Sequence, residues 1–194
     1  MSPLVHSKIS VNKRGGRIED YLPIHSFMDS TKEICSDNRH RILHTMWGIR
    51  RVIIPIFGNS LINSSGKEVN IKDLCEEDHI LPDFRNKFIP TVNDFVISYN
   101  GLPVDKEKIK QVFSIYQHDK EITNLLLSPL SLTGRLESLL ITHNSWFINE
   151  LIPRIFSIEP RVCSIAISPS DFFDNLNFES WMDNGTTIPK SAIK

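Results

Sequence analysis

The sequence lacks the features that mark several large protein classes. Its three cysteines are odd in number and form no CxxC pair, which argues against a disulfide framework and favours reduced thiols. No apolar run approaches the roughly 20 residues that span a bilayer, and the N-terminus lacks the apolar core of a signal peptide. We therefore expect a soluble, cytoplasmic protein with no membrane segment.

Signatures of several common activities are also missing. The chain has no GxGxxG motif and no P-loop, because Gly15-Gly16 is not followed by lysine and serine, and no serine-nucleophile motif occurs.

We find no internal repeat. The net charge of −1 lacks domain-wide basicity, although residues 1–58 hold nine Lys and Arg against five Asp and Glu. This balance argues against binding of duplex nucleic acid.

What the sequence does contain is enough apolar residues for a real core. The 194 residues, 40% of them hydrophobic, fit one domain or one domain with an added subdomain. Their spacing predicts a mainly α-helical bundle, with a central helix over 37–57 that Pro55 and Gly58 bring to an end. One small β-hairpin is expected with its turn at 64–66.

The best internal boundary is the run Asn100-Gly101-Leu102-Pro103. We predict a His-rich helical domain with the hairpin over 1–101. Residues 102–194 are expected to be an additional helical segment that packs on this domain and ends in a loose tail. Within it, RVCSIAI at 161–167 is β-prone.

Three residue pairs at a spacing of four are the strongest chemical signal. They are His25 with Asp29, His40 with His44, and His79 with Asp83. With 7 His and 12 Asp in the chain, chance gives about 0.7 such pairs, so three is an excess. Residues four apart on a helix lie one turn apart and can reach the same ion. A helix predicted over 19–34 would place the first pair mid-helix, whereas Pro82 makes Asp83 the least secure partner.

The candidate metal ligands are His25, Asp29, His40, His44 and His79, arranged around one or two divalent ions. Neutral imidazole and carboxylate groups suit Zn, Mn, Fe or Ni. The alternative is a structural network in which the histidines hydrogen-bond to helix ends and to one another. His6 is a weaker candidate because it has no partner four residues on, and His118 and His143 fit surface or packing roles.

The first half of the chain resembles a known family. The resemblance rests on the motifs GGRIEDYLPIHSFMDSTKE, DNRHRILH, INSSGKEV, EEDHILPD and IPTVNDF, over about residues 6–97. They are similar to an uncharacterised domain family of bacteria and phages, whose expected pattern is GGxxxDYLPIHxWFDxSK, RHRALxH, NSDGxxV, EQH and IPTVxDW. The matching positions are His25, Asp29, Lys32, Arg39, His40, Arg41, His44, Gly58, Asn63, Gly66, His79 and Asp94.

This chain departs from the family pattern without losing a candidate ligand. Phe27-Met28 replaces the Trp-Phe pair of the family pattern, and Glu77-Asp78 precedes His79 where the family has Glu-Gln. The segment from about 102 to 175 is not covered and has the character of an insertion. The resemblance implies no established activity.

Two classes of function remain open at this point. As an enzyme, the protein would be a metal-assisted hydrolase of a phosphoester, with Asp29 or Glu76 as base and Arg41 or Lys32 neutralising a small anionic substrate. As an interaction protein, it would have a structural histidine core and a helical surface for a protein partner, such as a host factor bound by a phage-associated protein. Homo-oligomers are compatible with either class.

Overall fold

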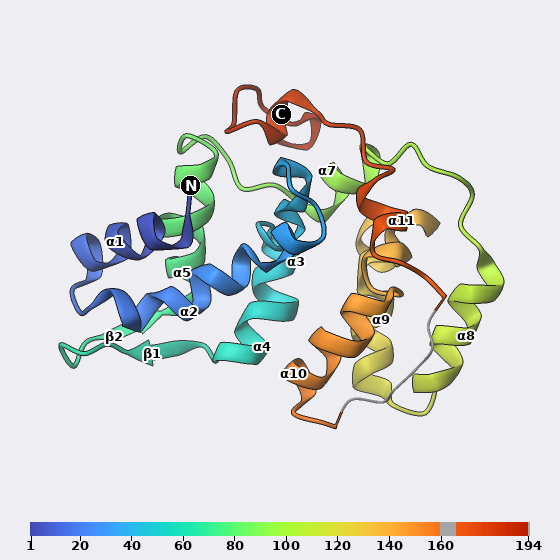
Figure 1. Ribbon diagram of the computed structural model, residues 1–194, viewed down its shortest axis with the longest axis horizontal. Coiled ribbons are helices and arrows are strands. Elements are labelled where there is room, and N and C mark those ends of the chain that lie inside the picture. Colours follow the sequence, from blue (N-terminus) through green and yellow to red (C-terminus); the bar gives the residue numbers. More distant parts are fainter. Residues whose placement is uncertain (160–165, 194) are drawn as a thin grey trace. The chain divides into compact units, whose positions relative to one another are not determined.

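The computed structural model describes residues 1–159 and 166–193. It is mainly α-helical with one two-stranded antiparallel sheet, as predicted (Figure 1). Most of the β-prone run, including Cys163, lies outside the described residues. Among the residues described, none of the helices combines the length and the apolar character that crossing a bilayer requires. Cys35 and Cys75 are buried free thiols.

The chain forms two compact units. The first contains Met1–Thr91 together with the C-terminal residues from Phe178 onward, and the second contains Val92–Asn177. The C-terminal residues therefore belong to the same compact unit as the first half of the chain.

In the first unit, α1 packs along α2, and the hairpin lies at the edge of the unit after α4 (Figure 1). The α-helices are α1 (Pro3–Arg14), α2 (Ile18–Met28), α3 (Met46–Gly48), α4 (Ile54–Phe57), α5 (Ile71–Leu74) and α6 (Leu81–Asp83). Segments Ser30–Glu33, Asn38–Leu43, Ser180–Met182 and Lys190–Ala192 are 3₁₀-helical, and Ile49–Ile53 and Cys75–Ile80 are π-helical.

The hairpin has the predicted position and turn. Strands β1 (Ser60–Ile62) and β2 (Glu68–Asn70) pair with Leu61 opposite Val69. The Asn63 Oδ1 atom accepts the backbone N–H groups of Ser65 and Lys67, which closes the turn. Two strands alone are only marginally stable in water. The side-chain amide of Asn63 also donates to Tyr21 Oη, and this bond fixes the hairpin to α2.

The predicted helix over 37–57 is wrong as a single element. Residues Asn38–Leu43 form a 3₁₀ helix in which Arg41 has the non-helical ψ of 26°, and His44 has ψ 38°. Thr45 then starts a new helix by accepting the N–H of Gly48 with its side chain. The apolar spacing is helical, but local side-chain hydrogen bonds to the backbone compete with a continuous helix.

A second correction concerns α2, which was predicted to continue to residue 34. It ends at Met28, so Asp29 is its C-terminal cap rather than a mid-helix residue, and a 3₁₀ turn follows. Pro23 lies inside α2 instead of in its first turn. The backbone N–H of Asp29 still bonds to the carbonyl of His25, so the two residues keep their one-turn relation at the end of the helix.

The second unit contains helices α7 (Val92–Ile97), α8 (Lys106–Tyr116), α9 (Lys120–Thr133), α10 (Ile152–Phe156) and α11 (Ser170–Phe173). It also has a 3₁₀ segment, Leu136–Ile141, and a π segment, Phe147–Leu151. The isolated bridge between Tyr99 and Leu176 joins its two ends.

Residues 136–156 repeat the local structure of residues 38–57, contrary to our finding of no repeat in the sequence. In each segment a 3₁₀ helix leads to a buried histidine, His44 or His143, and the next residue caps a new helix. The Thr45 and Asn144 caps each accept a backbone N–H at 3.0 Å from three residues on. A π segment and then a helix with proline at its second position complete both copies.

Candidate metal centre

Six side chains from the first unit converge in its interior. They are His6 in α1, Asp29 at the end of α2, His40 and His44 around the 3₁₀ segment, His79 in the π segment, and Asp83 at the end of α6. None of these residues is more than 5% exposed. Burial of so many titratable groups is costly unless each finds a partner or a cation.

The donor atoms form two groups of three that can each hold a metal ion. One group is Asp29, His40 and His44, and the other is His6, His79 and Asp83. Within each group the ligand atoms all lie within 4.8 Å of one another. Nitrogen and carboxylate oxygen in this proportion suit Zn, Mn, Fe or Ni.

The distances from Asp29 to two of the imidazoles match those between metal ligands better than those of hydrogen bonds. Asp29 Oδ1 lies 3.4 Å from His40 Nε2 and 3.5 Å from His44 Nε2. Two ligands of a tetrahedral ion with bonds of about 2.0–2.1 Å lie roughly 3.3–3.4 Å apart. Direct N–H···O hydrogen bonds are shorter, at about 2.7–3.2 Å. Asp29 Oδ1 and His40 Nε2 accordingly make no hydrogen bond.

Backbone carbonyls fix the tautomers of two of the histidines. His6 Nδ1 lies 2.9 Å from the carbonyl of Asp78, and His40 Nδ1 lies 2.6 Å from the carbonyl of Asp37. A carbonyl accepts only, so Nδ1 carries the proton in both rings. Each neutral imidazole therefore turns the lone pair of Nε2 toward the other donors, as metal coordination requires.

A short hydrogen-bond chain fixes His79 in the same way. Ser10 Oγ donates to the carbonyl of His6 and lies 2.9 Å from His25 Nε2, so it accepts the proton of that nitrogen. His25 Nδ1 is then an acceptor, and His79 Nδ1, 2.9 Å away, donates to it. The lone pair of His79 Nε2 consequently faces the cluster.

His44 differs from the other ligand candidates. Its Nδ1 atom is buried without a hydrogen-bond partner in the described structure, and its Nε2 atom lies 2.9 Å from His79 Nε2. Two nitrogen lone pairs at this distance repel one another unless a proton or a cation lies between them.

The protonation states of the cluster also suit a cation. Burial lowers the pKa of His40, and it lowers that of His79 well below the ordinary value, so both rings are neutral at pH 7. Asp29 and Asp83 each lie beside a cation, Lys32 or the Met1 ammonium, which favours the ionised carboxylate. Neutral imidazole beside ionised carboxylate is the ligand form of both groups.

Three cations surround the two carboxylates. Lys32 Nζ lies 2.7 Å from Asp29 Oδ2, and the side chain of Lys32 is 40% exposed. The Met1 ammonium lies 2.6 Å from Asp83 Oδ1 and is also partly exposed. Arg41 is buried beside Asp83 and donates to the carbonyl of Met182, which ties the C-terminal residues to the cluster. Of these three cations, Lys32 and the Met1 ammonium are partly exposed, and Arg41 is buried.

The structure brings together most of the predicted site residues and adds two. His40, His44, His79 and Asp29 contribute donors, whereas His25 stands behind His79 and belongs to neither group. Glu76 is held by Lys72 at 3.0 Å and also belongs to neither group.

Sequence reasoning underrated His6 and Asp83. His6 has no partner at a spacing of four because its partners lie on other elements. Asp83 sits at that spacing from His79, and Pro82 only starts the last helical turn rather than disturbing it. The π segment and α6 run on without a break, so the i+4 relation was a usable signal.

A family model matches residues 1–103, a range that includes all six donors. The chain belongs to the DUF6915 family. This family is described as a domain of unknown function, which agrees with the resemblance expected from the sequence words. Neither the curated proteins nor the solved structures give a match. The DUF6915 match ends before the residues from Phe178 onward, which contribute Met182 to the surroundings of Arg41.

Proposed function

We propose that the protein is a metal-dependent hydrolase of small phosphoesters, with its ion at Asp29, His40 and His44. The observation that carries the proposal is the set of three buried residues whose ligand atoms all lie within 4.8 Å of one another. Structural zinc sites are closed by four protein ligands, whereas catalytic sites use three and leave one position for water or substrate. The group around Asp29 supplies three.

Lys32 is the residue we assign to the substrate. Its ammonium lies beside a candidate ligand, Asp29, and its side chain is 40% exposed, so it can meet an incoming anion without leaving the centre. A phosphoester is the anion that such a cation and a divalent ion bind together. Lys32 would neutralise a phosphoryl oxygen as charge develops there.

Arg41 has a different role in this proposal. Its guanidinium donates to the carbonyl of Met182 and to Asn184 Oδ1, and it lies 5.1 Å from the ring centre of Phe84. With these partners and an exposed fraction of only 3%, it holds Asp83 and the C-terminal residues in place. We therefore assign Arg41 to positioning and Lys32 to the substrate.

A divalent ion at this centre would lower the pKa of a water molecule and polarise the phosphoryl group. Asp29 would be a ligand through Oδ1, and its Oδ2 atom pairs with Lys32, so it would not serve as base. Glu76 would have to break its ion pair with Lys72 before it could act as the general base.

An activity screen tests the proposal. Protein without an affinity tag is stripped with a chelator, loaded separately with Zn, Mn, Fe or Ni, and assayed on phosphomonoesters, phosphodiesters and nucleotides. We expect turnover with at least one metal, loss of turnover in His40→Ala, and a raised KM in Lys32→Gln with metal content unchanged. His143→Ala, which removes a buried histidine outside both groups, is the matched control.

Two results would contradict the hydrolase. Turnover that survives His40→Ala would place the chemistry elsewhere. A silent screen, together with a specific protein partner that binds metal-free protein and His40→Ala equally well, would favour the interaction protein with a structural histidine core.

A further inference from the structure

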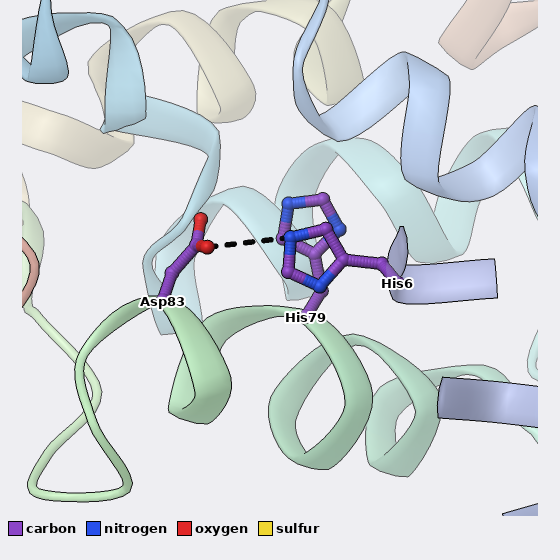
Figure 2. Close-up of side chains that lie close together, drawn as sticks. All are labelled: His6, His79 and Asp83. Atoms are coloured by element: carbon purple, nitrogen blue, oxygen red, sulfur yellow. Dashed lines mark ion pairs between the residues drawn. The ribbon is translucent and has the colours of Figure 1, made fainter. Parts of the chain in front are cut away.

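We propose that the centre holds two divalent ions, the second bound by His6, His79 and Asp83. This inference rests on the metal site of the proposed function and extends it by a separate ion with its own ligands. The second group comes largely from α1 and from the helical turns at 75–83 (Figure 2).

His6 is the first observation in its favour. Its Nε2 atom is completely buried, makes no hydrogen bond, and lies 3.3 Å from Asp83 Oδ1. Since Nδ1 donates to the carbonyl of Asp78, a neutral His6 directs an Nε2 lone pair at a carboxylate. That contact is repulsive by itself, and a cation between the two atoms makes it favourable.

The stacking of His6 on His79 brings the two rings to the same place. The ring centres lie 3.8 Å apart with an angle of 13° between the planes, and Figure 2 shows the two rings face to face. Two imidazoles stacked in this way can present nitrogen donors to one ion.

Asp83 connects the two groups. Its Oδ1 atom faces His6 at 3.3 Å, and its Oδ2 atom faces His44 at 3.5 Å, so one oxygen points to each group. A carboxylate with this arrangement would be able to bind one ion with each oxygen. Sites that hydrolyse phosphoesters with two metals keep the ions about 3.5–4 Å apart, which lets both act on one phosphoryl group.

The second ion should bind more weakly than the first. The Met1 ammonium already lies 2.6 Å from Asp83 Oδ1 and competes with an ion for that oxygen. The charge of the first ion also repels the second. We therefore expect two binding steps of different affinity.

Metal titration tests the inference. Untagged protein stripped with a chelator is titrated with Mn²⁺, and bound metal is measured after gel filtration. We expect two Mn²⁺ per chain in the wild type and one per chain in His6→Ala. Asp83→Asn, on a different element, should also bind one ion or fewer. His143→Ala serves as the control for loss of a buried histidine, and circular dichroism confirms that each variant is folded.

Electron paramagnetic resonance supplies a readout that stoichiometry alone cannot. With two equivalents of Mn²⁺, the wild type should give the multiline spectrum of an exchange-coupled pair, and His6→Ala should give only the mononuclear spectrum. One ion per chain in the wild type, with His6→Ala binding it equally well, would overturn the second site and leave the first intact. No bound metal in any protein would overturn the proposed function as well.

Discussion

At the residue scale, the centre depends on which nitrogen of each imidazole carries the proton. Hydrogen-bond acceptors outside the cluster take the Nδ1 protons of His6, His40 and His79. This arrangement leaves three Nε2 lone pairs in a buried space beside two carboxylates. Side chains that serve only to fill a core have no need for such a common orientation.

His25 shows how far sequence alone could assign the roles within this set. The i+4 spacing to Asp29 predicted a ligand, but its nitrogens face Ser10 and His79, each at 2.9 Å. The spacing correctly predicted that His25 lies next to the cluster, because α2 holds it there. It could not distinguish a ligand from the residue that orients a ligand, since both are histidines at the same site.

Substitution of His25 separates the two roles. As a positioning residue, it should weaken metal binding by about 10- to 100-fold when changed to alanine, because His79 loses its acceptor. His25→Gln should recover part of that loss through its amide oxygen. Competition titration with a coloured chelator measures both affinities. Complete loss of one ion in His25→Ala and His25→Gln alike would make His25 a ligand.

The buried histidine of the second unit gives a prediction on pH. Burial lowers the pKa of His143 to about 4 from its ordinary value of 6.5. Below pH 6.5 the unfolded chain takes up a proton that the folded chain refuses, so stability is lost as the pH falls from about 6.5 to 4. The loss from this group is about 3 kcal/mol.

Urea unfolding of metal-free protein at pH 7 and pH 4.5 checks the prediction for His143. The wild type should lose more unfolding free energy between the two values than His143→Leu does, by most of that amount. Equal losses in the two proteins would show that His143 is not buried in the neutral form.

At the scale of elements, the sequence predicted what local chemistry decides. The hairpin has a turn set by Asn63 and Gly66, and the α1 to α2 turn uses positive φ at Gly15 and Gly16, so both could be anticipated. The segment 37–57 could not. Its apolar spacing is helical, yet the bond from His40 to the carbonyl of Asp37 and the cap at Thr45 divide it.

Gly48 provides a test of this divided geometry. In an ordinary helix, Gly→Ala stabilises by about 0.5–1 kcal/mol. A Cβ at Gly48, however, would lie 2.5 Å from the carbonyl oxygen of Leu43, in the segment that carries His40. Gly48→Ala should therefore destabilise by about 1–3 kcal/mol and weaken metal binding.

A glycine in open space is the control for Gly48. Gly66 has a φ of 78° and no atom within 4 Å of an added Cβ, so Gly66→Ala should cost backbone strain alone and leave metal affinity unchanged. Denaturant unfolding and metal titration give both quantities. A stabilised Gly48→Ala with normal affinity would favour a continuous helix.

At the scale of the whole molecule, the chain combines a unit that contains the His and Asp cluster with a second unit that repeats part of its local structure. The repeat keeps the buried histidine, the capping residue, the π segment and the proline, but has Leu139 and Leu140 in the 3₁₀ segment where the first copy has His40 and Arg41. The short motifs HTMW at 44–47 and HNSW at 143–146 were a sequence signal for this structural repeat. The signal was weak because the residues around the two motifs are similar in polarity but mostly not identical.

The proposed metal site holds its ion at Asp29, His40 and His44. Anomalous scattering from crystals of Zn- or Mn-loaded protein, recorded on both sides of the metal absorption edge, tests for this ion. We expect a peak about 2.0–2.2 Å from Asp29 Oδ1, His40 Nε2 and His44 Nε2. Crystals grown with saturating metal that show no peak there, with the three side chains joined by direct hydrogen bonds, would contradict it.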